Sequence, residues 1–321
     1  MFIKKRYILL ILLSVVLLIA GLFYFREFRS LPDFSVHLMP DIEVPGKDQT
    51  VVIFSPHNDD ETIGAGGFID RSIKNGAKVI VVFITNGDGH VFSTMEDFRK
   101  VYPSAQNYID SGYQRQGESE AALSKLGVDS KDIIFLGYPD HGIKQLYDKN
   151  WKVAYESPYT KKSASPYPNS YTKNVSYTGE NLESDILKIL EKHKPSVVVS
   201  SYQFDQHTDH VATYNFVKKT IHDWPDSTVK NKYYYLVHYR QFPYPSGLRK
   251  DRFIAPPAKL VNIDVEWEKL SLTIEELQLK EQALLQYKSQ LDVPTLKKLV
   301  DSFIRQNELF AVENETTEQT D

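Results

Sequence analysis

The sequence of 321 residues contains no cysteine. The chain therefore forms no disulfide, and it cannot carry the lipidated cysteine of a lipoprotein anchor. A lack of cysteine suits an exported protein that needs no disulfide, although many cytosolic proteins also lack this residue. Cysteine usage thus excludes two kinds of covalent link and leaves the compartment open.

Basic charge is also scarce outside the N-terminus. Residues 1–30 carry five Lys or Arg and one Glu, so the remaining residues carry 33 basic and 41 acidic side chains, a net charge of −8. Proteins bind nucleic acid mainly by neutralising its phosphates. We therefore expect no nucleic-acid partner.

Long apolar runs are rare too, and the longest lies at the N-terminus. Residues 8–25, ILLILLSVVLLIAGLFYF, contain no charge and follow Lys4, Lys5 and Arg6. Such a run is just long enough to span a bilayer as a helix. No small-residue cleavage site follows it, so we expect residues 1–30 to form a cytoplasmic stub and an uncleaved signal-anchor rather than a cleaved signal peptide. The excess of basic residues before the run favours a single-pass cell-membrane protein with its N-terminus in the cytoplasm and the rest of the chain extracellular.

After a proline-punctuated stalk over residues 31–49, short apolar runs alternate with amphipathic segments. We expect strands over residues 50–55, 77–85, 132–138, 195–202 and 232–239, and helices over residues 61–75, 114–126, 180–193 and 209–222. This alternation is typical of a mostly parallel sheet with helices on both faces. The expected fold is therefore α/β, a Rossmann-like three-layer sandwich preceded by one transmembrane helix.

Three later segments depart from this alternation. Residues 141–179 are rich in Tyr, Ser, Lys and Pro and predict a long loop or a mobile lid over a binding site. Residues 266–291 repeat apolar side chains at helical spacing and predict one packing helix. Residues 311–321 are expected to be a disordered tail, which leaves residues 50–310 as a single domain.

Two clusters of histidine and acidic residues follow predicted strands. The first lies in FSPHNDDETIGAGG and contains His57, Asp59, Asp60 and Glu61; the second lies in YQFDQHTDH and contains Asp205, His207, Asp209 and His210. Either cluster alone is compatible with ordinary hydrogen bonds or a solvated helix start. Parallel sheets bind ligands beyond the carboxyl ends of their strands, where both clusters are expected. Zinc accepts imidazole and carboxylate ligands, whereas the rival ion Mg²⁺ seldom takes imidazole, so together the clusters predict a zinc site.

The glycines of GAGG, residues 64–67, follow the first cluster. A phosphate-binding loop is disfavoured here because the neighbouring acids would repel phosphate. We expect these glycines to allow close helix packing, and we expect no nucleotide partner.

The motifs resemble those of a known family, the PIG-L/LmbE-like N-acetylglucosaminyl deacetylases. SPHNDDE is similar to the family motif (A/S)-H-P-D-D-E, and further similarities follow in order: GAGG, VIVVFITNGDG (79–89), RQGESEAALSKLGV (115–128), FLGYPDHG (135–142), HTDHVAT (207–213) and KEQALLQYKSQ (280–290). Asn58 and Thr208 replace prolines that are common in the family. Neither substitution removes a ligand.

The resemblance implies one zinc ion per chain, held by His57, Asp60 and His210. It also implies that Asp59 is the general base, and that His207 stabilises the oxyanion or protonates the leaving amine.

Further residues are expected around these groups. The resemblance implies that Arg115 and Asp140 bind hydroxyls of the sugar. Asp205 and Glu61 are expected to lie behind the residues that touch metal or substrate, with Asp205 orienting His207.

The implied function is zinc-dependent hydrolytic removal of an N-acetyl group from an N-acetylglucosamine-type amino sugar. The sugar would belong to a glycan, glycolipid or other glycoconjugate at the membrane surface. The rival class is a non-catalytic, membrane-anchored carbohydrate-binding module that retains the deacetylase fold. Asp59 argues against that class, because a binding module has no need of a spare carboxylate beside the zinc.

Overall fold

The computed structural model describes residues 14–19, 35–261 and 265–314. The chain divides into two compact units, Met1–Met39 and Pro40–Asp321, and the second contains the sheet and the site. The apolar run over residues 8–25 lies mostly outside the described residues, although its residues 14–19 are helical. Within the described ranges, no helix is both long enough and apolar enough to cross a bilayer.

The second unit is built on a seven-stranded sheet in the order β3-β2-β1-β4-β5-β7-β6. Its strands are β1 Thr50–Ser55, β2 Lys78–Thr85, β3 Ile133–Tyr138, β4 Val197–Ser201, β5 Asn231–Tyr235, β6 Glu266–Ser271 and β7 Asn307–Asn314. The five neighbouring strands β3, β2, β1, β4 and β5 pair in parallel, whereas β7 runs antiparallel to both β5 and β6. The α/β, mostly parallel prediction is confirmed. The chain runs from β1 to β2 and β3 on one side of β1, and then to β4 on the other side. The carboxyl ends of β1 and β4 therefore border a topological switch point, where open α/β sheets bind ligands.

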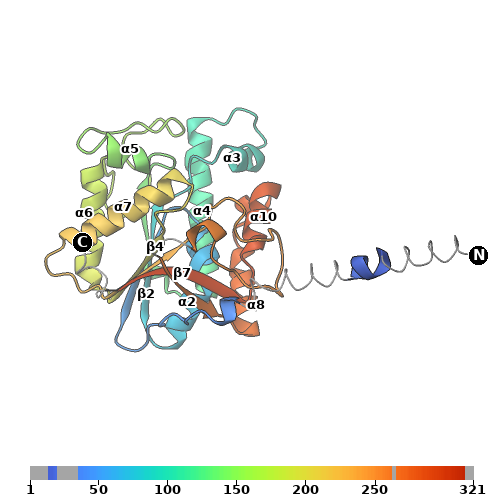
Figure 1. The fold of residues 1–321 in the computed structure, drawn as a ribbon. Coiled ribbons are helices and arrows are strands. Elements are labelled where there is room, and N and C mark those ends of the chain that lie inside the picture. The colour runs from blue at the N-terminus through green and yellow to red at the C-terminus, as the bar shows by residue number, and fades with distance from the viewer. Residues whose placement is uncertain (1–13, 20–34, 262–264, 315–321) are drawn as a thin grey trace, which may run out of the picture. The chain divides into compact units, whose positions relative to one another are not determined.

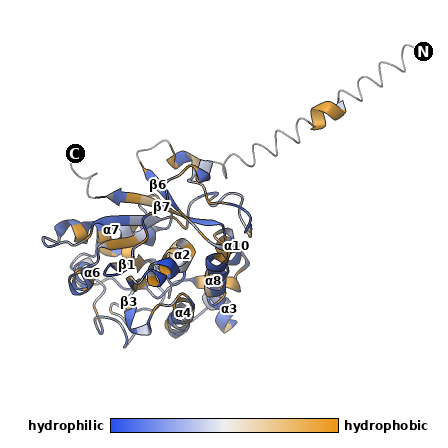
Figure 2. Cartoon of the chain, turned by 90° about the horizontal axis from the view of Figure 1, so that it is seen from below, coloured by the Kyte–Doolittle hydropathy of each residue, from blue (hydrophilic) through white to orange (hydrophobic). Residues whose placement is uncertain are grey.

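Helices cover both faces of the sheet (Figure 1, Figure 2). They are α2 Asp60–Lys74, α3 Val91–Phe98, α4 Ala105–Lys125, α5 Ile143–Asp148, α6 Gly179–His193, α7 Thr208–Asp223, α8 Ile274–Leu284, α9 Lys288–Leu291 and α10 Pro294–Ser302. Helices α6 and α7 bury Ile186 and Phe216 against Val52 and Phe54 of β1. Helix α2 packs on β1 and β2 from the other face, with α8 and α4 beside it. Burial of alternate β1 side chains on opposite faces explains why this strand is continuously apolar.

The glycines of α2 permit close packing, as predicted. A Cβ on Gly64 would lie 2.5 Å from Tyr235 Cγ, and a Cβ on Gly67 would lie 2.4 Å from Leu272 Cδ2. Both separations are far below van der Waals contact, so a larger residue would push α2 away from β5 or from the segment before α8.

The prediction of one helix over residues 266–291 is wrong. Residues Glu266–Ser271 form strand β6, whose backbone groups pair with β7, and helix begins only at Ile274. The helix start has a local cause, because the Thr273 hydroxyl accepts from Glu276 N–H and the Glu276 carboxylate accepts from Thr273 N–H. Trp267 and Leu270 are both buried, and their helical spacing does not distinguish helix from strand over so short a stretch.

Both ends of the predicted domain also differ. Residues 311–314, expected to begin a disordered tail, instead complete β7, where Ala311 and Val312 are buried; residues 315–321 lie outside the described residues. At the other end, the expected stalk joins the sheet. Ile42 N–H donates to Lys269 O at 2.8 Å, and Lys269 N–H donates to Pro40 O at 3.0 Å. Residues 40–42 thus pair with the edge strand β6, a contact that the sequence pattern did not predict.

The long segment over residues 141–179 contains α5 and is otherwise irregular. It is packed on its inner side, because Tyr167 and Tyr177 are fully buried and Tyr177 belongs to the main core. Tyr159 from the same segment lines the pocket described below. Movement of this segment as a lid stays a prediction.

Candidate active site

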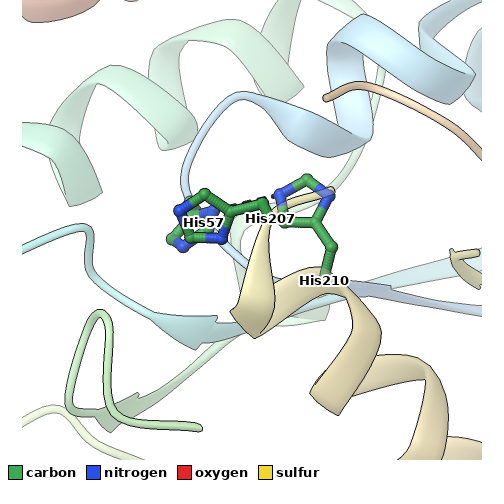
Figure 3. A group of neighbouring side chains, drawn as sticks. All are labelled: His57, His207 and His210. Carbon is green, nitrogen blue, oxygen red and sulfur yellow. Dashed lines mark hydrogen bonds between the residues drawn. The ribbon is translucent and has the colours of Figure 1, made fainter. Parts of the chain in front are cut away.

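The two predicted clusters meet at the switch point. His57 lies in the loop between β1 and α2, while His207 and His210 lie at the start of α7, after β4. Figure 3 shows the three imidazole rings gathered in one place, although His57 and His210 are 153 residues apart in the sequence. The parallel pairing of β1 with β4 brings these two loops to the same edge of the sheet.

Three ligand atoms converge in this cluster. Asp60 Oδ2 lies 3.0 Å from His57 Nδ1 and 3.0 Å from His210 Nε2, and the two nitrogens are 3.3 Å apart. Zinc–nitrogen bonds of about 2.0–2.1 Å at tetrahedral angles place ligand atoms about 3.3 Å apart. The donor atoms are therefore of the right type and nearly at the right spacing for zinc.

Electrostatics also favours a cation between these groups. Burial opposes a charge on His210, but the carboxylates of Asp205 and Asp60 outweigh it and raise the pKa of His210 to about 9. Burial likewise opposes ionisation of Asp60, yet His210 and His57 hold the pKa of Asp60 well below its usual range. In the described part of the chain, three sets of side chains could hold a metal: His57 with His207 and His210, Asp60 with His210 and His238, and His57 with Asp140 and Asp209. His57 and His210 each belong to two of these sets, and Asp60 belongs to one.

Each candidate ligand histidine faces a buried carboxylate with its far nitrogen. Asp205 Oδ2 lies 3.1 Å from His210 Nδ1, and Asp140 Oδ1 lies 3.2 Å from His57 Nε2. Such partners fix the ring orientation of ligand histidines and the nitrogen that carries the proton. The structure differs from one expectation, because Asp205 contacts the ring of His210 and only the backbone N–H of His207. Asp140 lines the pocket and its carboxylate accepts from Gly89 N–H at 3.0 Å, so its contact with sugar hydroxyls stays a prediction.

Asp59 differs from Asp60 in both accessibility and backbone. Its side chain is 13% exposed against 2% for Asp60, and both line the pocket. Burial, together with the charge of Asp60, raises the pKa of Asp59 well above its usual range, while Arg115 opposes the shift. The φ of Asp59 is 122°, a conformation that costs a non-glycine residue roughly 1–3 kcal/mol. Strained residues of this kind cluster at functional sites.

His207 caps α7 and has a defined tautomer. Its Nδ1 accepts a hydrogen bond from Asp209 N–H at 3.3 Å, so in the neutral ring the proton lies on Nε2. Burial, with the neighbouring His57 and His210, lowers the pKa of His207 well below its usual range. The ring is therefore neutral and can donate from Nε2.

Arg115 is buried and holds the loops around the site. It donates to Gly87 O at 3.0 Å and to Asn58 O at 2.9 Å, and it lies 4.0 Å from Asp59 Oδ2. Its Nε has no hydrogen-bond partner among the described residues. Arg115 lines the pocket, but two of its nitrogens are committed to backbone carbonyls, so contact with sugar hydroxyls stays a prediction.

The pocket above these residues has a volume of about 340 Å³. Its floor is polar and includes five of the nine histidines: His57, His90, His141, His207 and His238. One wall is apolar and comes from α3 and α10, with Val91, Phe92, Leu296, Leu299 and Val300. The pocket therefore has a floor with side chains that could bind a metal, and an apolar wall beside it.

Comparison with known proteins agrees with this geometry. The family described as PIG-L: GlcNAc-PI de-N-acetylase matches residues 52–221, which is more than half of the chain. The chain belongs to the PIG-L family. The match covers the loops after β1, β2, β3 and β4, but it ends before β5 and the C-terminal segments.

Among its relatives is the 1D-myo-inositol 2-acetamido-2-deoxy-alpha-D-glucopyranoside deacetylase of Kribbella flavida, 30% identical over 170 residues, which are 51% of this chain and 50% of that protein. The chain thus matches about half the length of this curated relative. Solved structures show the same fold. The N,N'-diacetylchitobiose deacetylase of Pyrococcus horikoshii has a TM-score of 0.52 at 18% identity, covering 90% of this chain and 92% of that one. A deacetylase of the teicoplanin biosynthesis pathway has a TM-score of 0.54 at 17% identity, covering 84% and 99%.

Several residues at or near the site were not predicted from the sequence. The sequence predicts no role for Asp209, yet this residue is fully buried and its Oδ2 lies 3.6 Å from His57 Nε2. His238 follows β5, and the rule of strand carboxyl ends could have found it. Tyr287 and Gln290 belong to the motif KEQALLQYKSQ, for which the sequence predicted no role, and they come from the turn around α9.

Proposed function

We propose that this protein is a zinc-dependent deacetylase that removes the N-acetyl group from an N-acetylglucosamine-type amino sugar. The observation that carries the proposal is the convergence of His57 Nδ1, Asp60 Oδ2 and His210 Nε2 next to the strained, partly exposed Asp59. Family membership and the name of the Kribbella relative support the choice of an acetamido sugar.

His57, Asp60 and His210 would hold the ion. Bound there, zinc would supply a Lewis acid that polarises the acetamide carbonyl and lowers the pKa of a water molecule towards ~7. Asp59 takes the proton of the attacking water and later gives it to the leaving amine nitrogen. His207 Nε2–H donates to the oxygen that gains negative charge when the carbonyl carbon becomes tetrahedral. The products are acetate and a free amine.

The rival proposal, a carbohydrate-binding module, explains fewer features. Binding requires neither a carboxylate with strained backbone nor a neutral imidazole with a fixed proton. The strained backbone of Asp59 raises the free energy of the folded state, and neither feature improves contacts to a sugar. They are accounted for by catalysis, which is why we favour the enzyme.

The apolar wall bears on the class of glycoconjugate. Side chains of α3 and α10 continue the pocket outward from the polar floor, and Phe92 is 70% exposed. Exposed apolar surface that borders a polar site fits a substrate with an apolar group beside its amino sugar. We therefore favour a glycolipid over an unsubstituted glycan.

The decisive experiment compares Asp59→Asn with Asp60→Asn in acetate release from an N-acetylglucosamine conjugate. Asp59→Asn is nearly isosteric, so about one zinc per chain should remain while kcat falls by roughly 10²–10⁴-fold with KM little changed. Asp60→Asn should lose zinc first, and added zinc should restore part of its activity only.

Ligand variants provide the control for the metal assignment. His210→Ala should empty the site, whereas His207→Ala should keep zinc and lose kcat. An active, zinc-replete Asp59→Asn enzyme would remove the proposed mechanism, and loss of zinc from His207→Ala would overturn the ligand set.

A further inference from the structure

The backbone of Asp59 is held by one buried carboxylate. Glu61 Oε2 accepts the N–H of Asp59 at 3.2 Å and lies 3.2 Å from Ser55 Oγ. Glu61 is fully buried, so its carboxylate cannot reach the pocket as a base. Its position fits a supporting role, because it binds the residue whose φ is strained.

The other oxygen of Glu61 is fixed from a distant part of the chain. Glu61 Oε1 accepts from the Tyr287 hydroxyl, and it also accepts from Thr62 Oγ1 at 2.7 Å. Tyr287 lies between α8 and α9, it is fully buried, and 226 residues separate it from Glu61. A continuous chain of hydrogen bonds therefore runs from Tyr287 through Glu61 to the backbone of Asp59.

Other residues of the segment 280–290, which we call the C-terminal brace, contact the same helix. Helix α2 is broken at Ala65, where φ is −141° and ψ is 20°. Lys280 Nζ donates to Ile63 O, before the break, at 2.8 Å, and to Glu308 Oε1 at 2.6 Å. Glu308 in turn accepts the N–H groups that follow the break, those of Gly67 at 2.7 Å and Phe68 at 2.9 Å. The buried pair thus joins the two halves of α2.

The brace also holds helix α4. Ser289 donates to Glu118 through its N–H at 2.9 Å and through its hydroxyl at 2.6 Å. Glu118 lies one turn after Arg115, the arginine that binds the loop carbonyls at the site. One short segment therefore contacts α2 and α4, two of the helices that carry pocket residues.

We propose that the C-terminal brace positions the catalytic base, with Tyr287 acting through Glu61 to hold Asp59 in its strained conformation. This inference rests on the proposed function, in which Asp59 takes a proton from water. It assigns a role to KEQALLQYKSQ, a motif that the zinc chemistry leaves without one. Tyr287 touches neither substrate nor metal, so it is a positioning residue.

The test replaces the hydroxyl and keeps the ring. Tyr287→Phe should lower kcat by roughly 10–100-fold, because a small misplacement of a reacting group has effects of that size. KM and zinc affinity, measured by competition with a chelator, should stay within about twofold, because no ligand or pocket contact is removed. A merely structural role would lower thermal stability and leave the kcat of the folded enzyme unchanged.

A matched control removes the same kind of bond elsewhere. Tyr138 is also fully buried and donates to a buried carboxylate, Asp185 Oδ2 on α6, at 3.0 Å. Tyr138→Phe should reduce stability by an amount similar to Tyr287→Phe and leave kcat within about twofold.

A double-mutant cycle identifies the route. In an Asp59→Asn background, Tyr287→Phe should have no further effect on kcat, because the group that it positions has already been removed. Equal kcat values for Tyr287→Phe and Tyr138→Phe, with Asp59→Asn inactive, would overturn the brace and leave the proposed function standing. If Asp59→Asn is itself fully active, the proposed function fails instead.

Discussion

At the scale of single residues, the site is surrounded by buried acids whose charges affect one another. Asp88 is almost fully buried below the pocket, and it accepts hydrogen bonds from Tyr167 Oη at 2.8 Å and from Asp140 N–H at 3.3 Å. Burial, together with the charge of Asp140, raises the pKa of Asp88 to about 7. The folded protein therefore retains a proton that the unfolded chain releases near its ordinary pKa of 3.8.

This residue predicts a pH dependence of stability. Because the native state binds the proton more tightly, the free energy of unfolding should fall as the pH rises from about 4 to about 7. Asp88→Asn cannot ionise, so its stability relative to the natural protein should improve across this window, by up to about 4 kcal/mol. Urea unfolding of both zinc-free proteins at pH 5 and pH 8 measures the difference. A difference that does not change with pH would show that Asp88 does not hold the proton.

At the scale of elements, the pocket depends on two helices outside the parallel α/β pattern. Helices α3 and α10 carry the apolar wall, and α10 lies beyond the part of the chain that matches the family. Leu296 and Leu299 are three residues apart and therefore share one face of α10. The part of the wall from α10 therefore lies outside the family match, whereas the part from α3 lies inside it.

The wall predicts a preference among substrates. Burial of a Phe side chain by an alkyl group is worth about 1.5–3 kcal/mol, or roughly 10–100-fold in kcat/KM. Phe92→Ala should therefore lower kcat/KM for the octyl glycoside of N-acetylglucosamine by about that factor, and it should barely affect the methyl glycoside. Ile274→Ala is the control, because Ile274 is 72% exposed and does not line the pocket. Equal losses on the two glycosides would exclude an apolar subsite at Phe92.

At the scale of the whole molecule, the folded unit begins earlier than the motifs suggest. Residues 40–42 pair with β6, so the functional domain extends from about Pro40 to the end of β7. We keep membrane anchoring by residues 1–30 as a proposal, based on the apolar run over residues 8–25 and the basic residues before it.

Truncation tests this proposal. The full chain should sediment with membranes and resist extraction by salt, whereas residues 40–321 should stay in the supernatant with unchanged kcat on a methyl glycoside. The physical reason is that the proposed catalytic residues and their partners all lie in the unit Pro40–Asp321. A full-length chain that remains in the supernatant would contradict the anchor.

The sequence by itself determined the features that depend on local pattern. The short apolar run over Val51–Phe54 predicts strand β1, and all four residues are buried in the structure. The alternation of such runs with amphipathic helices predicts a parallel sheet. Ligands bind beyond the carboxyl ends of parallel strands. This rule and the family resemblance together predicted that His57, Asp60 and His210 lie in one site. Local spacing failed for β6, because its two apolar positions in six residues, Trp267 and Leu270, fit a strand as well as a helix.

Only the tertiary structure decided which groups support the site. Asp205 lies at the ring of His210 instead of that of His207, since the first turn of α7 directs the two rings differently. Tyr287 meets Glu61 because α8 packs on α2, a contact between residues 226 positions apart. A motif specifies which donors and acceptors are available, whereas their partners depend on helix packing and sheet register. For this reason the sequence could name the candidate metal ligands, and only the folded chain shows what holds them in place.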